Sequence, residues 1–225
     1  TVPEQRGQGL AAAIVYGLFR GLPDGGRVFH KQVGFHDLYH GDGVAGGPDG
    51  QLGSIQQVQS PPEGLIRARL RVNLNGFVPR LLTRTTGLLV LAEDQPRAEN
   101  RVTIDSSRMD AFGVPQLVVS HRHTRRDERA RNALMGRARA VLREAGAFFS
   151  YRHDVRTFSH AAGTVRFGED ERSAPTDPWC RFRGLENLFV VDSSVMPTAG
   201  GVNPSLTIAA NALRVGERLA REGGP

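Results

Sequence analysis

The sequence predicts a mixed α/β fold, in which an antiparallel sheet with helices forms most of the chain and a last strand and helix belong to a second, parallel sheet. Three observations predict it. Residues 65–72 (LIRARLRV) alternate apolar and charged side chains, the pattern of a half-exposed strand. Residues 125–144 place apolar side chains at helical spacing among arginines. Residues 188–194 (LFVVDSS) form a continuous apolar run ending in polar residues, as in a strand buried on both faces.

The first half of the chain contains short elements separated by loops. Residues 7–20 (GQGLAAAIVYGLFR) predict a helix. Residues 41–64 are rich in Gly, Pro and Gln, and they predict a loop around a short strand near residues 55–58. After the strand at 65–72, residues 81–94 (LLTRTTGLLVLAED) predict a further strand that ends in acids.

Two strands and a helix follow. "NRVTID" (100–105) and "PQLVVSHRH" (115–123) predict strands, because the Gly and Pro of the segment between them mark turns. The helix at 125–144 has one apolar face, formed by Leu134, Ala138, Val141 and Leu142.

A helix over residues 204–221 ends the fold. Its predicted inner face is made of small and apolar residues that would lie close against a neighbour: Leu206, Ala209, Ala210, Leu213, Gly216 and Ala220. One strand and one helix cannot form a doubly wound domain alone. We therefore expect the larger part of that domain to lie outside these 225 residues.

The composition excludes several classes of protein. Hydrophobic residues make up 39% and charged residues 23%, which indicates a globular chain. No apolar run reaches the roughly 18 residues of a membrane span. The net charge of +6 comes from arginines mixed with acids or arranged around the amphipathic helix, so it does not require nucleic acid. Cys180 is the only cysteine, which excludes an internal disulfide and fits a cytoplasmic location.

Three motifs resemble functional sites and are interpreted otherwise. "GDGVAG" (41–46) matches a dinucleotide-binding pattern, but the Gly-Pro-Asp-Gly that follows cannot begin the required helix. "HDLYH" (36–40) resembles a zinc-protease motif, but glycines bracket it and leave room for one helical turn only. "HRH" (121–123) is interpreted as surface or pocket wall. The sequence thus predicts no metal site.

His160 and Asn203 are the candidates for chemistry, and each has a plain structural alternative. Small residues follow His160, which leaves room for a planar group beside an imidazole that can take a proton near neutral pH. The same histidine can equally well hydrogen-bond a loop. Asn203 precedes Pro204, a normal helix start in which the asparagine caps the helix. That helix terminus also carries about half a positive charge, which would stabilise an anion.

These segments resemble the glucose–methanol–choline (GMC) oxidoreductases, a family of flavoenzymes. The resemblance lies in "HAAGTVRFG", "TDPWCRFRGLENLFVVDSSVMPT" and "NPSLTIAANALRVGERL", which occur in the family's order. Upstream, "AEDQPRAENRVTID" and "DAFGVPQLVVSHRH" also resemble the family, and "GFHDLYHGDG" does so more loosely. Together these pieces cover most of residues 30–221.

The resemblance implies a role for each matching residue. His160 takes the place of the active-site histidine that accepts the alcohol proton, and Asn203 that of a second catalytic residue, a His or an Asn. The implied cofactor is FAD, with its hydride acceptor at flavin N5. Residues implied to contact it are Asp192, Ser193, Asn203, Pro204 and Thr207.

The resemblance also implies that this chain is the C-terminal part of an enzyme that oxidises an alcohol or sugar. Residues 1–158 would form the substrate-binding domain, and residues 159–225 the C-terminal segment of a Rossmann-like FAD domain. The rest of that domain, about 250 to 300 residues, is expected on a second polypeptide or in a cleaved N-terminal half. Candidate substrate contacts are His36, Tyr39, His40, Gln56 and Gln57. The alternative is a non-catalytic binding or scaffold subunit that keeps the fold without the cofactor.

Overall fold

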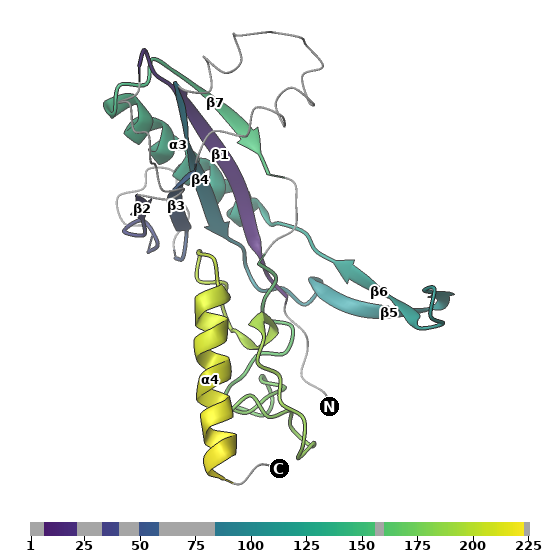
Figure 1. The fold of residues 1–225 in the computed structure, drawn as a ribbon. Coiled ribbons are helices and arrows are strands. Elements are labelled where there is room, and N and C mark those ends of the chain that lie inside the picture. The colour runs from purple at the N-terminus through teal and green to yellow at the C-terminus, as the bar shows by residue number, and fades with distance from the viewer. Residues whose placement is uncertain (1–6, 22–32, 41–49, 59–83, 156–159, 223–225) are drawn as a thin grey trace. The chain divides into compact units, whose positions relative to one another are not determined.

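The computed structural model describes residues 7–21, 33–40, 50–58, 84–155 and 160–222 (Figure 1). The predicted strand at 65–72 and the "GDGVAG" loop lie outside them. The chain divides into two compact units. The first comprises Thr1–Leu10, Glu93–Thr124 and Phe158–Pro225, and the second comprises Ala11–Ala92 and Arg125–Thr157. The functional division at residue 158 stays a prediction.

The second unit is built on a five-stranded sheet in the order β2-β3-β4-β1-β7. Its strands are β1 (Leu10–Leu18), β2 (Gly34–Phe35), β3 (Gly53–Val58), β4 (Thr85–Glu93) and β7 (Phe149–Asp154). The β2/β3, β3/β4 and β1/β7 pairs are antiparallel. The predicted antiparallel sheet is therefore confirmed, together with the strands expected near 55–58 and within 81–94.

The helix predicted over residues 7–20 is wrong, because this segment forms β1. Its alanines favour a helix, but Ile14, Val15 and Tyr16 are residues that favour strands. β1 lies between β4 and β7, and nearly all its side chains are buried, so the alternation that marks an exposed strand is missing. Burial on both faces outweighed the helix propensity of the alanine run, since tertiary packing commonly overrides intrinsic propensity.

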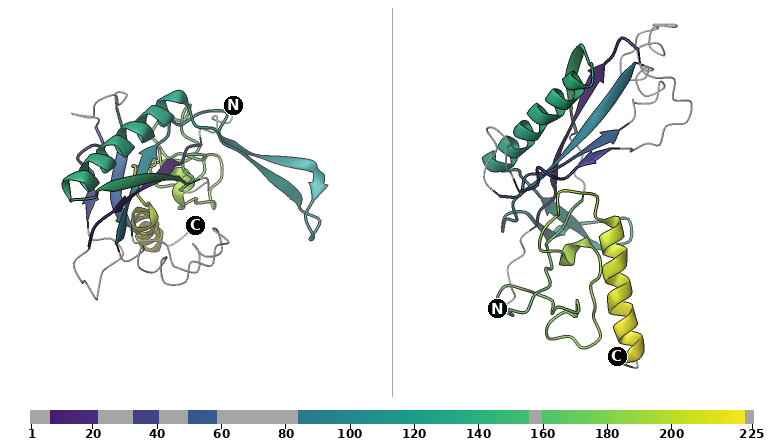
Figure 2. Two further views of the ribbon diagram at one scale, coloured as in Figure 1. Left: turned by 90° about the horizontal axis from the view of Figure 1, so that it is seen from above. Right: turned by 90° about the vertical axis from the view of Figure 1, so that its left-hand side faces the viewer.

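The predicted helix at 125–144 is confirmed as α3 (Arg125–Glu144), which packs along the sheet (Figures 1 and 2). Leu134, Ala138 and Leu142 lie in the core with β1 and β4, as expected. Val141 is exposed, so the predicted apolar face is wrong at that position. Met135 lies in the core instead.

The first unit contains a hairpin of β5 (Arg101–Met109) and β6 (Pro115–Ser120), which confirms the two strands expected there. Asp110 forms the turn, where its Oδ1 accepts hydrogen bonds from the backbone N–H groups of Phe112 at 2.8 Å and Val114 at 3.0 Å. Many apolar side chains of this hairpin are exposed: Ile104, Met109, Phe112, Val114, Leu117, Val118 and Val119.

The buried strand predicted at 188–194 does not form. Phe189 makes a single bridge to Arg181, and a 3₁₀ turn, η1 (Ser193–Val195), follows. The apolar run was correctly expected to pack, because Phe189, Val190 and Val191 contact a core of Cys180, Val195 and Val215. Without neighbouring parallel strands among the described residues, the run has no ladder to join.

The C-terminal helix is confirmed as α4 (Ser205–Arg221), but its predicted inner face is wrong. Leu206 is 83% exposed and Leu213 is 68% exposed, whereas Val215 and Leu219 face the core. The exposed residues form the continuous small and apolar stripe that the sequence predicted to be covered.

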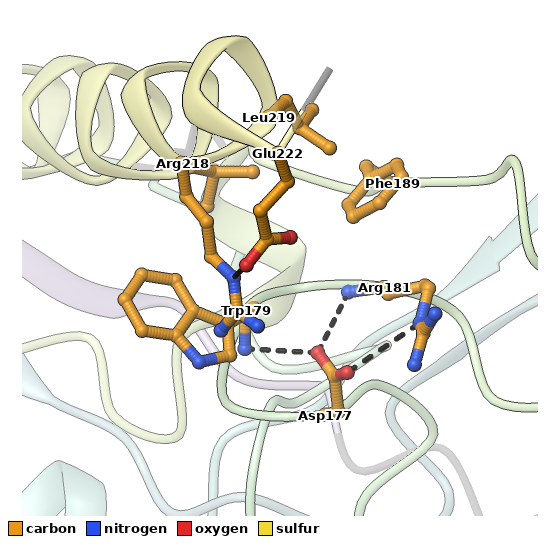
Figure 3. A pocket seen from close by; sticks show the side chains of 8 residues that line it. Asp177, Trp179, Arg181, Phe189, Arg218, Leu219 and Glu222 are labelled. Carbon is orange, nitrogen blue, oxygen red and sulfur yellow. Dashed lines mark hydrogen bonds and ion pairs between the residues drawn. The ribbon is translucent and has the colours of Figure 1, made fainter. Parts of the chain in front are cut away.

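Trp179 packs against Arg214 and Arg218 of α4. The guanidinium carbons of Arg214 and Arg218 lie 4.5 Å and 4.1 Å from the centre of its indole ring, a cation–π arrangement. Figure 3 shows Trp179 and Arg218 at the edge of a small hollow of about 70 Å³. Asp177 accepts hydrogen bonds there from the backbone N–H groups of Trp179 and Arg181. The contacts anchor α4 and therefore fix the position of its N-terminal end. Neither α3 nor α4 has the length and apolar character needed to cross a bilayer.

Candidate active site

The side chains of His160 and Asn203 meet in the first unit, although they are 43 positions apart in the chain. His160 Nε2 lies 3.3 Å from Asn203 Nδ2. Because an amide nitrogen can only donate, Nε2 is the acceptor of this hydrogen bond. The pair thus presents an imidazole beside a carboxamide, and Asn203 is exposed.

The backbone of His160 is strained. Its φ of 56° lies in the left-handed region, which few residues other than glycine adopt. The segment after it is held on both sides. Gln8 and Ala162 exchange two backbone hydrogen bonds of 3.0 Å, and Ser193 Oγ donates to Ala161 O at 2.6 Å. These contacts keep the imidazole in an orientation that the local sequence would not favour.

Asn203 does not cap α4. The N-cap is Pro204, and no side chain caps the helix, so the structural alternative in which Asn203 caps α4 is wrong. The carboxamide is directed to His160 instead.

Glu93 fixes the loop that leads to Asn203, a role that the sequence analysis missed. Its buried carboxylate Oε1 accepts the backbone N–H groups of Ala199 at 2.9 Å and Gly200 at 3.2 Å. The sequence signal was an acid at the end of an apolar strand, where an unpaired carboxylate would be unfavourable. Its partners, more than 100 positions away, were not visible in the sequence.

The residues implied to contact a cofactor lie around the pair, and several already make local hydrogen bonds. Asp192 is exposed, and its Oδ1 accepts the N–H of Ser194 at 2.7 Å at the start of η1. Ser193 Oγ is bonded to Ala161 O. Pro204 is buried at the start of α4, and Thr207 is exposed on its first turn.

The five candidate substrate residues lie in the second unit. "HDLYH" forms a turn after β2, and the rings of His36 and Tyr39 stack at 4.8 Å. His40 meets the edge of Tyr39. Gln56 and Gln57 are neighbours on β3, so their side chains point to opposite faces of the sheet and cannot line one pocket together.

Comparison with known proteins identifies a family whose match includes His160 and Asn203. The sequence profile of the family described as GMC oxidoreductase matches residues 96–212. The 6'''-hydroxyparomomycin C oxidase of Streptomyces lividus is 37% identical over 131 residues, which are 56% of this chain and 24% of that protein. The 2-methyl-1,2-propanediol dehydrogenase of Mycolicibacterium austroafricanum is 32% identical over 139 residues, which are 60% of this chain and 25% of that protein.

A solved structure shares the fold. Pyridoxine 4-oxidase from "Mesorbium loti" superimposes with a TM-score of 0.60 and 16% sequence identity. The match covers 98% of this chain and 44% of that one. The aligned part of this chain therefore spans about a quarter of the length of these curated relatives.

Proposed function

This chain belongs to the GMC oxidoreductase family, and from that premise we propose that it is the C-terminal part of an FAD-dependent enzyme that oxidises an alcohol or sugar hydroxyl. The observation that carries the proposal is the 3.3 Å contact between His160 Nε2 and Asn203 Nδ2. Two further observations support it: the strained backbone of His160, and the similarity to an oxidase and a dehydrogenase of hydroxyl compounds.

The residues around the pair fit a flavin. Ala161 is exposed, and no side chain larger than a methyl group occurs from 161 to 163. Gly200 has a φ of 65°, and a methyl group added there would meet nothing within 4 Å. A planar ring can therefore approach the two polar side chains. Asn203, Pro204 and Thr207 would lie beside the ring, and Asp192 and Ser193 nearer the chain that links it to the nucleotide.

His160 and Asn203 have complementary tasks in this proposal. A bound substrate hydroxyl would replace the Asn203 N–H at the Nε2 lone pair. Nε2 can then take the hydroxyl proton, a step that typically contributes about 10²–10⁴ in rate. The Asn203 N–H donates to the substrate oxygen and orients the carbon that carries the leaving hydrogen. A bound flavin supplies the acceptor for that hydrogen and its two electrons, so the hydroxyl becomes a carbonyl.

We also propose that the cofactor-binding part of the enzyme covers the exposed apolar stripe of α4. The aligned part of this chain spans only about a quarter of the length of its relatives. The side chains of Leu206 and Leu213 are exposed. The covering part would be carried on a second polypeptide or on a further stretch of the same protein. The cytoplasmic location suggested by the single cysteine stays a prediction.

The test is a matched pair of histidine variants of the flavin-loaded enzyme. His160→Ala should keep the flavin absorbance and lower alcohol turnover by about 10²–10⁴-fold. His153→Ala, an exposed histidine of β7, should keep turnover. Unchanged turnover in His160→Ala would show that His160 is not the base that accepts the substrate proton. A colourless enzyme whose partner has no dinucleotide fold would favour the non-catalytic alternative.

A further inference from the structure

The "HRH" segment reaches a buried acid that the proposed oxidation does not use. In the first unit, His121 Nε2 lies 2.5 Å from Asp94 Oδ2, and His123 Nδ1 lies 3.6 Å from the same oxygen. The side chains of Asp94, His121 and His123 are 0%, 13% and 31% exposed. The expectation that these histidines are surface or pocket wall is therefore incomplete, because both imidazoles face one buried carboxylate.

Both carboxylate oxygens of the buried Asp94 have close partners. The Gly9 bond occupies Oδ1, which leaves Oδ2 facing the two rings. A buried negative charge with two imidazoles on one side is a ligand set for a divalent ion.

A hollow of about 110 Å³ adjoins the cluster at His121. His121 and Gln8 line it together with small residues such as Ala161 and Ala162. Gln8 is 1% exposed, and neither its Nε2 nor its Oε1 has a hydrogen-bond partner among the described residues. Buried polar atoms of this kind are normally satisfied. The hollow has room for a water molecule, which needs about 10–15 Å³, and the Gln8 amide would hydrogen-bond to it.

We propose that Asp94, His121 and His123 bind one divalent transition-metal ion of the zinc class, with water in the adjoining hollow completing its coordination. The three ligand atoms lie within 4.8 Å of one another. Two ligands of a tetrahedral zinc ion lie about 3.3 Å apart, since each is about 2.0–2.1 Å from the metal. The 3.6 Å distance between His123 Nδ1 and Asp94 Oδ2 is already close to this value. The His121 ring must move by about 1 Å as the ion replaces the proton in its hydrogen bond.

The ion would be structural. It would join Asp94, which directly follows β4, to the segment after β6, and Asp94 is itself bonded to Gly9; these three lie in the first unit. Asp94 directly follows Glu93, which holds the loop before Asn203. Metal binding is therefore expected to stabilise the support of the active site without touching the reacting atoms.

The experiment titrates the chelator-treated protein with Zn²⁺ by calorimetry and with Co²⁺ by visible spectroscopy. We expect one equivalent to bind, the thermal midpoint to rise, and Co²⁺ to give the bands of a four-coordinate site. His123→Ala, whose side chain is partly exposed and whose fold is checked by circular dichroism, should weaken binding by at least about 100-fold. His153→Ala should leave it unchanged.

The outcomes decide the proposal without substrate or flavin. Absence of Zn²⁺ heat and Co²⁺ bands, or equal binding in wild type and His123→Ala, would show that the cluster is a metal-free hydrogen-bond network. The experiment does not measure turnover, so absence of metal binding would not contradict the proposed oxidation. Conversely, unchanged alcohol turnover in His160→Ala would contradict the proposed oxidation but not the metal site.

Discussion

His160 Nε2 and Asn203 Nδ2 lie 3.3 Å apart across a separation of 43 residues. Neither residue is placed by its own segment. His160 has a left-handed backbone, and Asn203 stands one residue before the cap of α4. Their meeting depends on two separate supports, the contacts of Gln8 and Ser193 with residues 161–162 and the bond of Glu93 to the loop at 199–200.

Asn203→Ala should lower turnover of the complete enzyme by about 10²–10³-fold, because one positioned donor to the substrate oxygen is lost. Asn203→His should keep much of the activity, since an imidazole N–H can donate from the same place. Steady-state kinetics of both variants, at equal flavin content, measure the difference. Equal losses in the two variants would mean that the hydrogen bond is not the important property of this residue.

Glu93→Gln should loosen the loop before Asn203 while keeping the side-chain shape. Hydrogen bonds to a charged acceptor contribute about 1.5–3 kcal/mol, and the amide weakens both of them. Hydrogen exchange at the Ala199 and Gly200 amides should become faster. Glu99→Gln is the control, because Glu99 is 71% exposed and pairs with Arg97 at the surface, where such pairs contribute little. Unchanged exchange in Glu93→Gln would contradict the support role.

Replacing Leu206 and Leu213 with Gln should weaken binding of the cofactor-binding part without unfolding this chain. Both side chains are exposed here, and burial of each leucine in the assembled enzyme is worth about 1.5–3 kcal/mol. Flavin retained per chain after gel filtration measures the effect, with Glu217→Ala on an exposed turn of α4 as the control. Full flavin retention in the double variant would show that the stripe is not the contact surface.

Two glycines of the second unit should respond oppositely to alanine. At Gly53 the backbone φ is 131°, and an added Cβ would lie 1.9 Å from Leu91 O across the β3/β4 ladder. Gly53→Ala should therefore destabilise the unit by about 3 kcal/mol or more. Gly136 lies inside α3 with nothing within 4 Å, so Gly136→Ala should stabilise by about 0.5–1 kcal/mol. Urea unfolding measures both, and a neutral Gly53→Ala would contradict the strand register.

The free energy of unfolding of the second unit should decrease at alkaline pH, because Tyr16 loses its proton. Burial, and then the neighbouring Tyr151 stacked at 5.1 Å, raise the pKa of Tyr16 above 10.0. The folded protein therefore holds this proton more tightly than the unfolded chain. The resulting stability is complete below pH 10.0 and is lost as the pH rises through the folded pKa.

Tyr16→Phe has no such proton to lose, so its unfolding midpoint should depend less on pH than that of the wild type. Urea midpoints measured from about pH 8 to about pH 11 provide the test. Parallel pH profiles for the two proteins would mean that another group governs the alkaline loss.

The sequence by itself determined the elements whose signal lies within their own segment. The arginine-rich periodicity defined α3 from residue 125 to 144, the Gly and Pro between two apolar runs defined the β5–β6 hairpin, and the family motifs pointed to His160 and Asn203. These signals are local, because the helix repeats its apolar side chains with its own period and Gly and Pro mark the turn where they stand.

Only the tertiary structure decided the segments whose neighbours are distant. β1 is buried on both faces and shows no period, and residues 188–191 pack without a ladder. The stripe of α4 is exposed although it is apolar. The same holds for the contacts of His160 with Asn203, of Glu93 with Ala199 and of "HRH" with Asp94. Long-range packing brings these groups together, and no local pattern in the chain records which distant partner each one meets.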